Sequence, residues 1–409
     1  MLIVQKFGGS SVANAERIYN VANRIIESYD KGKNNVIVVL SAQGDTTDEL
    51  IEKAKEINPK ASKREMDMLL STGEQQSVAL MAMAIQALGY PAVSLNAMQV
   101  GIDSSSTYGN ARIKTIGKAR IELELSRKNI VLITGFQGVN RFDDITTLGR
   151  GGSDTTAVAI AAALQADICE IYTDVAGVYT ADPRVVPNAK KLNEISYEEM
   201  LELASLGAKV LHNRSVELAK KYNVQLVVRS SLTREEGTVV KEGSKVEKML
   251  VSGVASDKDV SRITVVGVDD IPGKAFKLFS SLAKEKISVD IILQSLGRDN
   301  KKDISFTVSK SDLAHALEVL EEAKDSLGAS EIVHDDNIAK LSVVGAGMAT
   351  NPGVASLMFE ALFDAGINIS MISTSEIKIS VLINSENTEE AVRSIHDKFM
   401  TAIASLRKE

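Results

Sequence analysis

The residues best suited to chemistry are gathered in one segment, Leu148–Leu164, which reads LGRGGSDTTAVAIAAAL. Arg150 lies among glycines, and Ser153 and Asp154 stand before a small, apolar stretch that we predict to be a buried helix. Glycines let backbone N–H groups approach an anion, a helix start presents unpaired donors, and a guanidinium matches a carboxylate or phosphate. We therefore predict an anion-binding site, although serine, aspartate and threonine are also ordinary helix-capping residues.

Composition narrows the class of protein. The chain has 409 residues, enough for roughly two or three domains, and its formal net charge of −7 argues against a nucleic-acid-binding surface. Its one cysteine, Cys169, cannot form an internal disulfide, and its four histidines lack metal-ligand spacing, so we expect no protein metal site. No apolar run is long enough to cross a bilayer, and the N-terminus lacks a signal peptide. We expect a cytoplasmic protein without membrane or nucleic-acid partners.

Short apolar strands alternate with helical stretches through the first part of the chain. The predicted strands are Leu2–Val4, Val36–Leu40, Ala92–Leu95, Ile130–Thr134, Ile168–Thr173 and Gln225–Arg229. This alternation indicates an α/β fold with a mainly parallel sheet and helices on both of its faces. Such sheets bind ligands at the carboxyl ends of their strands, so each polar loop that follows a strand is a candidate for the site.

Lys6 stands near the end of the first strand, just before the adjacent glycines Gly8 and Gly9. A strand, a glycine turn and a helix hold phosphates in several folds, and a lysine at the strand end can meet phosphate oxygens. The glycine spacing fits neither the dinucleotide pattern nor a P-loop. The alternative is a solvated lysine beside a tight turn.

Other polar segments each have a binding interpretation and a structural one. The loop Ser41–Asp48 either lines a ligand or caps the next helix. Glu74 precedes the apolar stretch Val78–Leu88, where it either accepts an ammonium group or favours the helix dipole as a first-turn acid. Lys209 lies at the start of the predicted helix Ala208–Lys221, where a cation opposes the dipole and a ligand phosphate would explain it.

The run from Asp174 to Arg184 combines an acid, an aromatic ring and an arginine after the predicted strand Ile168–Thr173. These side chains suit a nucleoside base, a ribose and a phosphate. They suit an ordinary hairpin with a proline turn equally well, so both interpretations stay open on the residues alone.

An internal repeat follows a change of composition near Glu235. Ile263–Ile292 and Leu341–Ile372 share the positions of glycines, prolines and apolar residues, and each copy continues with a strand and a helix. The first copy has a closing strand, Glu331–His334, which gives the order βαββαβ. The second copy has none, and the otherwise unassigned strand Leu250–Ala255 could complete it.

Five ordered motifs resemble those of the aspartokinases. They are KFGGSSV at Lys6–Val12, LSAQGDTTDEL at Leu40–Leu50, STGE at Ser71–Glu74, LGRGGSDTTA at Leu148–Ala157 and TDVAGVYTADPR at Thr173–Arg184. The paired repeats resemble ACT regulatory domains, so the resemblance covers essentially the whole chain. Ser10 stands where threonine is more usual, and Asn213 follows His212 where many members have proline.

The resemblance implies an amino acid kinase fold followed by two ferredoxin-like βαββαβ ACT domains. The expected domains are the catalytic domain at 1–245, a linker strand with the first ACT domain at 246–335, and the second ACT domain at 336–409, which strand 250–255 could complete. The chain is similar to the short, single-function form, because no homoserine dehydrogenase half follows. The family also implies a homo-oligomer, at least a dimer paired through ACT domains.

For activity, the resemblance implies ATP-dependent phosphorylation of the L-aspartate side chain to 4-phospho-L-aspartate, the first step of lysine, threonine and methionine biosynthesis. Lys6, Asp154 and Lys209 take the catalytic positions, with Mg2+ bridging the nucleotide phosphates. The positions that resemble ATP contacts are Lys6, Gly8, Gly9, Ser10, Thr173, Asp174, Tyr179, Asp182, Arg184 and Lys209. Those that resemble aspartate contacts are Ser41, Thr47, Glu74, Arg150, Gly151, Gly152 and Ser153.

These residue types fit phosphoryl transfer, which needs positioning and charge neutralisation. A carboxylate acceptor is already ionised at neutral pH and needs no general base. Two other functions would use part of the same pattern. A dehydrogenase also has strand, turn and helix starts of this kind, but the spacing of Gly8 and Gly9 does not fit a dinucleotide-binding turn. A non-catalytic amino-acid sensor would not need the charged residues that are present at the catalytic positions.

Control by an amino acid is the remaining expectation. In the first repeat, Asp270 and Gln294 match the effector-binding positions of the resembling enzymes, whereas Asp269 reads better as a turn residue. In the second repeat, Asn368 and Ile369 begin the next predicted strand and leave an edge for a partner subunit. We expect lysine, threonine or both together to inhibit by binding between ACT domains.

Overall fold

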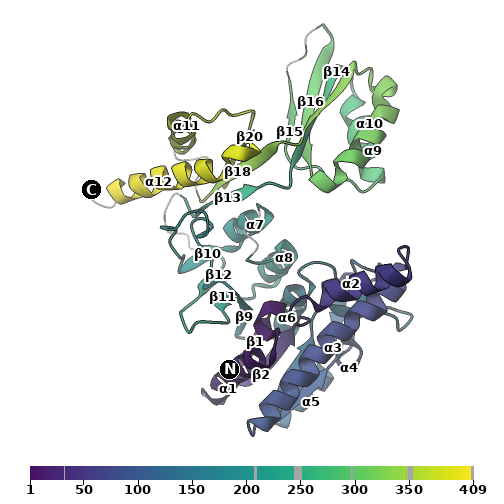
Figure 1. Ribbon diagram of the computed structural model, residues 1–409, viewed down its shortest axis with the longest axis vertical. Helices are drawn as coiled ribbons and strands as arrows, with labels where there is room; N and C mark the ends of the chain where they lie inside the picture. Colours follow the sequence, from purple (N-terminus) through teal and green to yellow (C-terminus); the bar gives the residue numbers. More distant parts are fainter. Residues whose placement is uncertain are drawn as a thin grey trace. The chain divides into compact units, whose positions relative to one another are not determined.

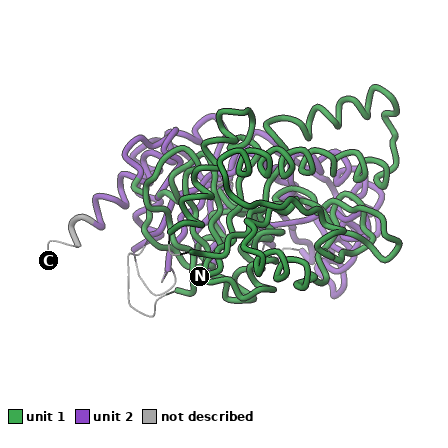
Figure 2. The backbone as a smooth tube through the Cα atoms, turned by 90° about the horizontal axis from the view of Figure 1, so that it is seen from below, with its two compact units in different colours: residues 1–179, 190–246 green, residues 180–189, 247–409 purple. Residues whose placement is uncertain are grey.

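The computed structural model describes residues 1–31, 33–206, 210–243, 251–295, 297, 299–346, 348 and 353–406. The chain divides into two compact units, which Figure 2 shows in different colours. The first unit comprises Met1–Tyr179 and Lys190–Val246, and the second comprises Thr180–Ala189 and Glu247–Glu409.

A mainly parallel sheet forms the centre of the first unit (Figure 1). Its strands follow the order β10-β12-β11-β9-β1-β2-β6-β3, in which β12 runs antiparallel to β11 and the other described neighbours are parallel. Their bounds are β1 Leu2–Phe7, β2 Asn35–Leu40, β3 Ala92–Leu95, β6 Ile130–Thr134, β9 Ile168–Thr173, β10 Glu194–Ser196, β11 Leu226–Ser230 and β12 Thr238–Lys241. The predicted α/β fold with a mainly parallel sheet is confirmed.

Helices cover both faces of this sheet. The helices are α1 Ala15–Asp30, α2 Thr46–Ile57, α3 Lys63–Ala87, α4 Ala97–Val100, α5 Ala119–Ser126, α6 Gly152–Leu164, α7 Tyr197–Ser205 and α8 Asn213–Tyr222. Apolar residues of α1 and α3 share one core with β1, β2 and β6. Helix α6 contacts β1, β2 and β9, and its residues 152–161 are buried. Because α6 is small and apolar on every side, its N-terminus is held rigidly against the sheet.

A small sheet beside the main one was not predicted. Its strands are β4 Ile102–Ser104, β5 Ile113–Ile116, β7 Gln137–Val139 and β8 Ile145–Thr147, in the order β5-β4-β7-β8. Strands of three or four residues carry too little alternation to be recognised from the sequence. Strand β8 ends directly before the glycine-rich segment that begins at Leu148, so this sheet sets where that segment starts.

In the second unit, the first repeat forms a complete βαββαβ sandwich. Its elements are β14 Ser261–Asp269, α9 Lys274–Lys284, β15 Ile292–Gln294, β16 Lys301–Val308, α10 Leu313–Leu327 and β17 Glu331–Asp335. The antiparallel sheet has the order β15-β16-β14-β17. Apolar residues of α9 and α10 pack on one face of it.

The second repeat takes its fourth strand from the linker. Its own elements are β18 Ile338–Val344, α11 Val354–Asp364, β19 Met371–Thr374, β20 Lys378–Asn384 and α12 Thr388–Leu406. Strand β13, Gly253–Asp257, pairs antiparallel with β18 and occupies the place that β17 holds in the first repeat. Strand β13 begins later than the predicted Leu250–Ala255, and Leu250 lies outside the described residues.

The segment Thr180–Ala189 belongs to the second unit, although it follows β9 closely in the sequence. Ala181 and Val186 are buried in the core of the second repeat. The Thr180 hydroxyl and the Nε2 atom of His396 on α12 are 2.9 Å apart. None of the helices in the described ranges is both long and apolar enough to cross a membrane.

Candidate functional site

The polar loops meet at one edge of the main sheet because their strands are parallel. The last residues of β1 and β2 pair directly, Phe7 with Leu40, and Leu40 in turn pairs with Thr134 of β6. On the other side of β1, Phe7 pairs with Tyr172 of β9. The loops after β2 and β6 therefore lie on one side of β1, and the loop after β9 lies on the other.

Lys6 and Asp154 form the central pair of this edge. The Lys6 Nζ and Asp154 Oδ1 atoms are 2.7 Å apart, and only 12% and 11% of the two side chains are exposed. Lys6 is therefore not the solvated lysine of the alternative interpretation. The N-cap residue of α6 is Gly151, and no side chain caps this helix. The Asp154 carboxylate therefore forms the ion pair and does not cap the helix.

Lys209, the third predicted catalytic residue, lies outside the described residues. The helix predicted to contain it begins later than expected, because α8 starts at Asn213 with His212 as its N-cap residue. Asn213 thus occupies the first helical position, where proline is also well tolerated.

The glycine turn after β1 is packed against the loop after β2. A Cβ atom on Gly9 would lie 2.5 Å from the carbonyl oxygen of Ala42, so only glycine fits there. The Gly44 N–H donates to the Gly9 carbonyl at 3.0 Å, and the hydroxyls of Ser11 and Ser231 are 2.8 Å apart. Ser10 stays exposed. The turn is thus fixed from both sides, as a preorganised phosphate cradle requires.

Glu74 is buried in the middle of α3, with 3% of its surface exposed. The first-turn interpretation is wrong, because α3 begins at Lys63 and the apolar stretch is only its later part. The Ala42 N–H donates to Oε1 at 3.1 Å, while Oε2 has no hydrogen-bond partner among the described residues. Burial raises the pKa of Glu74 from 4.5 to about 7, against the lowering effect of the Ala42 N–H. A buried acid with an unsatisfied oxygen suits a ligand ammonium group.

We expect Glu74 to make stability fall as the pH rises. The folded-state pKa is raised, so between the ordinary value of 4.5 and about 7 the folded protein binds more protons than the unfolded chain. Above that window the charged, buried carboxylate costs up to about 3 kcal/mol. Glu74→Gln keeps the acceptor for the Ala42 N–H, so its Tm should exceed that of the wild type by more at pH 8 than at pH 5. Thermal unfolding measures this, with exposed Glu52→Gln as the control, and an advantage independent of pH would contradict it.

Arg150 is exposed at the tip of a tight turn between Gly149 and Gly151, whose φ angles are 78° and 67°. The Gly152 N–H donates to the Gly149 carbonyl at 3.0 Å and closes the turn. A Cβ atom on Gly151 would lie 2.2 Å from Cγ of His212, so that position needs glycine for both its conformation and its space. Ser153 is buried at the start of α6, and Ser41 and Thr47 are half-buried beyond β2.

The support of this turn was not found from the sequence. Asp67 is buried and accepts hydrogen bonds from the N–H groups of Gly109 and Thr147 and from the Thr147 hydroxyl, at 2.7–3.1 Å. Burial raises the pKa of Asp67 despite these donors. Phe136 has a left-handed backbone with φ of 69° and lies against Gly152. No motif marks these residues, because their partners are distant in the sequence.

The predicted nucleotide residues are divided between the two units. Thr173 ends β9, and its hydroxyl accepts a hydrogen bond from the Val175 N–H at 2.9 Å. Asp174 is exposed, and Tyr179 is half-buried and pairs with Lys191 in a β-bridge. These three residues belong to the first unit together with Lys6, Gly8 and Gly9.

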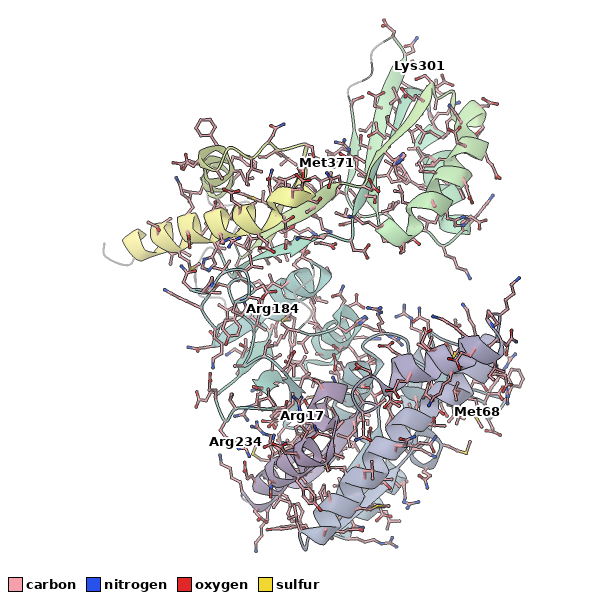
Figure 3. All side chains as sticks on the ribbon, viewed as in Figure 1. Arg17, Met68, Arg184, Arg234, Lys301 and Met371 are labelled. Atoms are coloured by element: carbon pink, nitrogen blue, oxygen red, sulfur yellow. The ribbon has the colours of Figure 1, made fainter. Side chains whose placement is uncertain are left out.

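Asp182 and Arg184 belong to the second unit. They form an ion pair of 2.7 Å, and the Arg184 N–H also donates to Asp182, as in a local turn. The Arg184 side chain is 83% exposed (Figure 3). The contacts of Asp182 and Arg184 are therefore those expected of a proline turn. The pair belongs to a different unit from Lys6.

Three of the predicted effector residues, Asp270, Gln294 and Asn368, are exposed, whereas Ile369 is half-buried against the core of the second repeat. Asp270 forms an ion pair of 2.8 Å with Lys302, and Gln294 is the exposed last residue of β15. Asp269 is held by Lys274 and Lys301, whose hydrogen bonds lower its pKa to about 2, which agrees with a structural role. The strand predicted to begin at Asn368-Ile369 begins instead at Met371.

Comparisons with known proteins identify the family of this chain. The model of the amino acid kinase family matches residues 1–230, and the ACT domain model matches residues 263–323 and 341–399. These matches define a kinase of the amino acid kinase class with ACT domains. The aspartokinase of Geobacillus stearothermophilus is 52% identical over 399 residues, which is 97% of each chain. The chain therefore belongs to the aspartokinases, within the amino acid kinase family.

Two solved structures of Escherichia coli aspartokinase III are also similar. The complex with aspartate and ADP, in the R-state, has a TM-score of 0.81 and 25% identity over 97% of this chain and 99% of that one. The complex with lysine and aspartate, in the T-state, has a TM-score of 0.74 and 26% identity over the same shares. The resemblance in the motifs and the predicted fold class are both confirmed.

Proposed function

We propose that this protein transfers the γ-phosphoryl group of ATP to the side-chain carboxylate of L-aspartate and so forms 4-phospho-L-aspartate, the first step of lysine, threonine and methionine biosynthesis. The observation that carries the proposal is the place of the Lys6–Asp154 pair. Lys6 lies on β1, between the acceptor loops after β2 and β6 and the nucleotide loop after β9, and Asp154 reaches it from the first turn of α6. A similar solved aspartokinase holds aspartate and ADP.

Lys6 provides the main electrostatic stabilisation of the transition state. Its ammonium group stabilises the charge that spreads over the equatorial oxygens of the phosphoryl group, and Asp154, 2.7 Å away, orients it. The N–H groups of Gly8 and Gly9 complete the cradle, with Ser10 beside them, and Lys209 serves as a second cation. The acceptor carboxylate is already ionised, so no side chain has to remove a proton.

The substrate is positioned by charges of both signs. Arg150 binds the α-carboxylate of aspartate, and buried Glu74 binds its ammonium group. Ser41, Thr47, Ser153 and the N–H groups of Gly151 and Gly152 line the remaining surface. A zwitterion held at both ends presents its side chain to the nucleotide in one orientation, which removes much of the entropic cost of the transfer.

The nucleotide binds on the side of β1 where the loop after β9 lies. Within the first unit, Thr173, Asp174 and Tyr179 contact the nucleoside. For Asp182 and Arg184 the proposal rests on the sequence motif alone. Within the described residues, no group of three or more histidine, cysteine or acidic side chains is arranged to hold a metal ion. Mg2+ typically binds through substrate phosphates, water and one or two carboxylates, and here Asp154 would hold it. When bound, the ion would neutralise the charge of the nucleotide phosphates.

The test of this function is the choice of acceptor. With ATP and Mg2+, aspartate should give an acyl phosphate that hydroxylamine traps as a hydroxamate. Glutamate should be poorer by at least about tenfold, because its extra methylene displaces the reacting oxygen while both ends remain bound. Equal turnover of the two amino acids would show that the acceptor is not set by Arg150 and Glu74.

For regulation, we propose that lysine, threonine or both bind between ACT domains of two subunits of a homodimer or larger assembly. A lysine complex of E. coli aspartokinase III in the T-state supports an amino-acid effector. Asp270 is suited to the effector ammonium group, which would replace the Lys302 ammonium group now 2.8 Å away. Gln294, Asn368 and Ile369 are the further candidates at the strand edges.

Asp270→Ala and Gln294→Ala are expected to weaken inhibition and leave uninhibited turnover nearly unchanged. Coupling between sites is typically about 1–3 kcal/mol, so the half-inhibiting concentration should rise on the order of tenfold. Initial rates across effector concentrations measure this, with exposed Glu322→Ala on α10 as the matched control. The proposal fails if neither amino acid inhibits the wild type, alone or combined, or if both variants remain as sensitive as the wild type.

A further inference from the structure

Arg214 joins two loops that surround the Arg150 turn. It lies in the first turn of α8, which packs against α6 (Figure 1). Its Nη1 group donates to the carbonyl of Leu148 at 2.8 Å, and its Nη2 group donates to the carbonyl of Ala111 at 2.7 Å. The two amino groups thus hold main-chain atoms from two different segments.

The Arg150 turn is held at both of its ends by residues from the start of α8. At the beginning of the turn, Arg214 holds Leu148, whose own N–H donates to the Phe136 carbonyl at 2.9 Å. At the end of the turn, Gly151 lies against the His212 ring so closely that a Cβ atom has no room. Between these supports, Arg150 has an exposed side chain and a flanking glycine on each side, so its position depends on them.

The loop that contains Gly109 and Ala111 is connected to the same turn by hydrogen bonds. The Ala111 N–H donates to the Thr147 carbonyl at 2.8 Å, and Asp67 receives the N–H groups of both Gly109 and Thr147. The Arg214 guanidinium closes this ring of hydrogen bonds, because its planar fork reaches two carbonyls at once. A lysine ammonium in its place would have to choose one of them.

The cost of placing a cation here indicates a role beyond folding. Arg214 is half-buried, and burial lowers its pKa. The charge of Arg112 lowers that pKa further, and the Glu217 carboxylate acts in the opposite direction. A partly desolvated charge is costly, and hydrogen bonds to two carbonyls offset that cost only in part.

We infer that Arg214 is a positioning residue for the amino-acid substrate, acting through the turn that carries Arg150. This inference rests on the proposed function of Arg150 as the α-carboxylate ligand. Arg214 itself contacts main-chain carbonyls, and its loss is expected to let the turn move and so misplace the Arg150 guanidinium.

The test compares Arg214→Met and Arg214→Lys with the wild type and with exposed Arg127→Met as the control. Loss of hydrogen bonds from a charged group should raise the KM for aspartate roughly tenfold to hundredfold. The KM for ATP should stay within about twofold, since the nucleotide side does not depend on the turn. Arg214→Lys and Arg214→Gln each keep a single nitrogen donor group that can reach one of the two carbonyls, so both should lie between the wild type and Arg214→Met.

A double-mutant cycle with Arg150→Ala separates positioning from a general structural role. If Arg214 acts through Arg150, adding Arg214→Met to Arg150→Ala should change the KM for aspartate by less than about twofold. Additive losses, equal effects on both substrates, a wild-type KM for aspartate in Arg214→Lys, or variants that all fail to fold would each overturn the inference. A wild type that does not phosphorylate aspartate would instead overturn the proposed function.

Discussion

Lys6→Ala is expected to lower kcat by roughly two or more orders of magnitude, which is the scale of losing one preorganised electrostatic contact to the transition state. The KM values should change far less, because the lysine stabilises charge that develops during transfer. Its place supports this expectation, since its ammonium group lies 2.7 Å from Asp154 in a site where only 12% of its side chain meets solvent.

Removing Lys6 also leaves the Asp154 carboxylate without the ion-pair partner it has here, so folding must be measured alongside kcat. Lys6→Ala/Asp154→Asn removes both charges and should restore stability while turnover stays low. Exposed Lys55→Ala is the matched control and should retain wild-type turnover. A Lys6→Ala enzyme that folds normally and keeps kcat within a few-fold of the wild type would remove Lys6 from the catalytic role.

Arg150→Ala is expected to raise the KM for aspartate roughly tenfold to hundredfold, since hydrogen bonds from a charged group contribute about 1.5–3 kcal/mol. The KM for ATP should stay nearly constant, because Arg150 serves the acceptor. The variant should also fold normally, because this side chain is exposed at the tip of its turn. Substrate-dependence of initial rates for both substrates measures the effect.

Arg150→Lys provides the sharper comparison. It keeps the charge but not the planar fork that matches a carboxylate, so only part of the aspartate affinity should return. Exposed Arg234→Ala, far from the turn in the sequence, is the control. An unchanged KM for aspartate in Arg150→Ala would mean that another cation binds the α-carboxylate.

The local sequence was sufficient to predict those features of the structure that depend on residues close together in the chain. The runs Ile130–Thr134 and Ile168–Thr173 are strands with the predicted bounds, because a strand buried on both faces is mainly apolar. The exception in the second run is Glu170, which forms an ion pair with Arg229. Lys6, two residues before Gly8, and the Arg-Gly-Gly-Ser-Asp run were likewise predicted to be site residues from the sequence. The repeat was evident because two copies of one pattern share one core.

Several features were decided by contacts between residues distant in the chain. The Glu74 carboxylate reads locally as a first-turn acid, yet α3 begins well before it and buries it against Ala42. The completion of the second repeat by the linker strand was predicted from its missing closing strand, whereas Thr180–Ala189 leaves its sequence neighbours for the second unit. Such pairings depend on the closure of long loops, which no local pattern encodes.

What the sequence by itself determined, then, is the set of chemical groups and the strands that carry them. The tertiary structure decided which of those groups meet. Lys6 pairs with Asp154 only because β1 and α6 are packed together, and Arg214 reaches Leu148 and Ala111 across separations of 66 and 103 residues. The physical reason is that side-chain hydrogen bonds and ion pairs form over a few ångströms in space, whatever the distance along the chain.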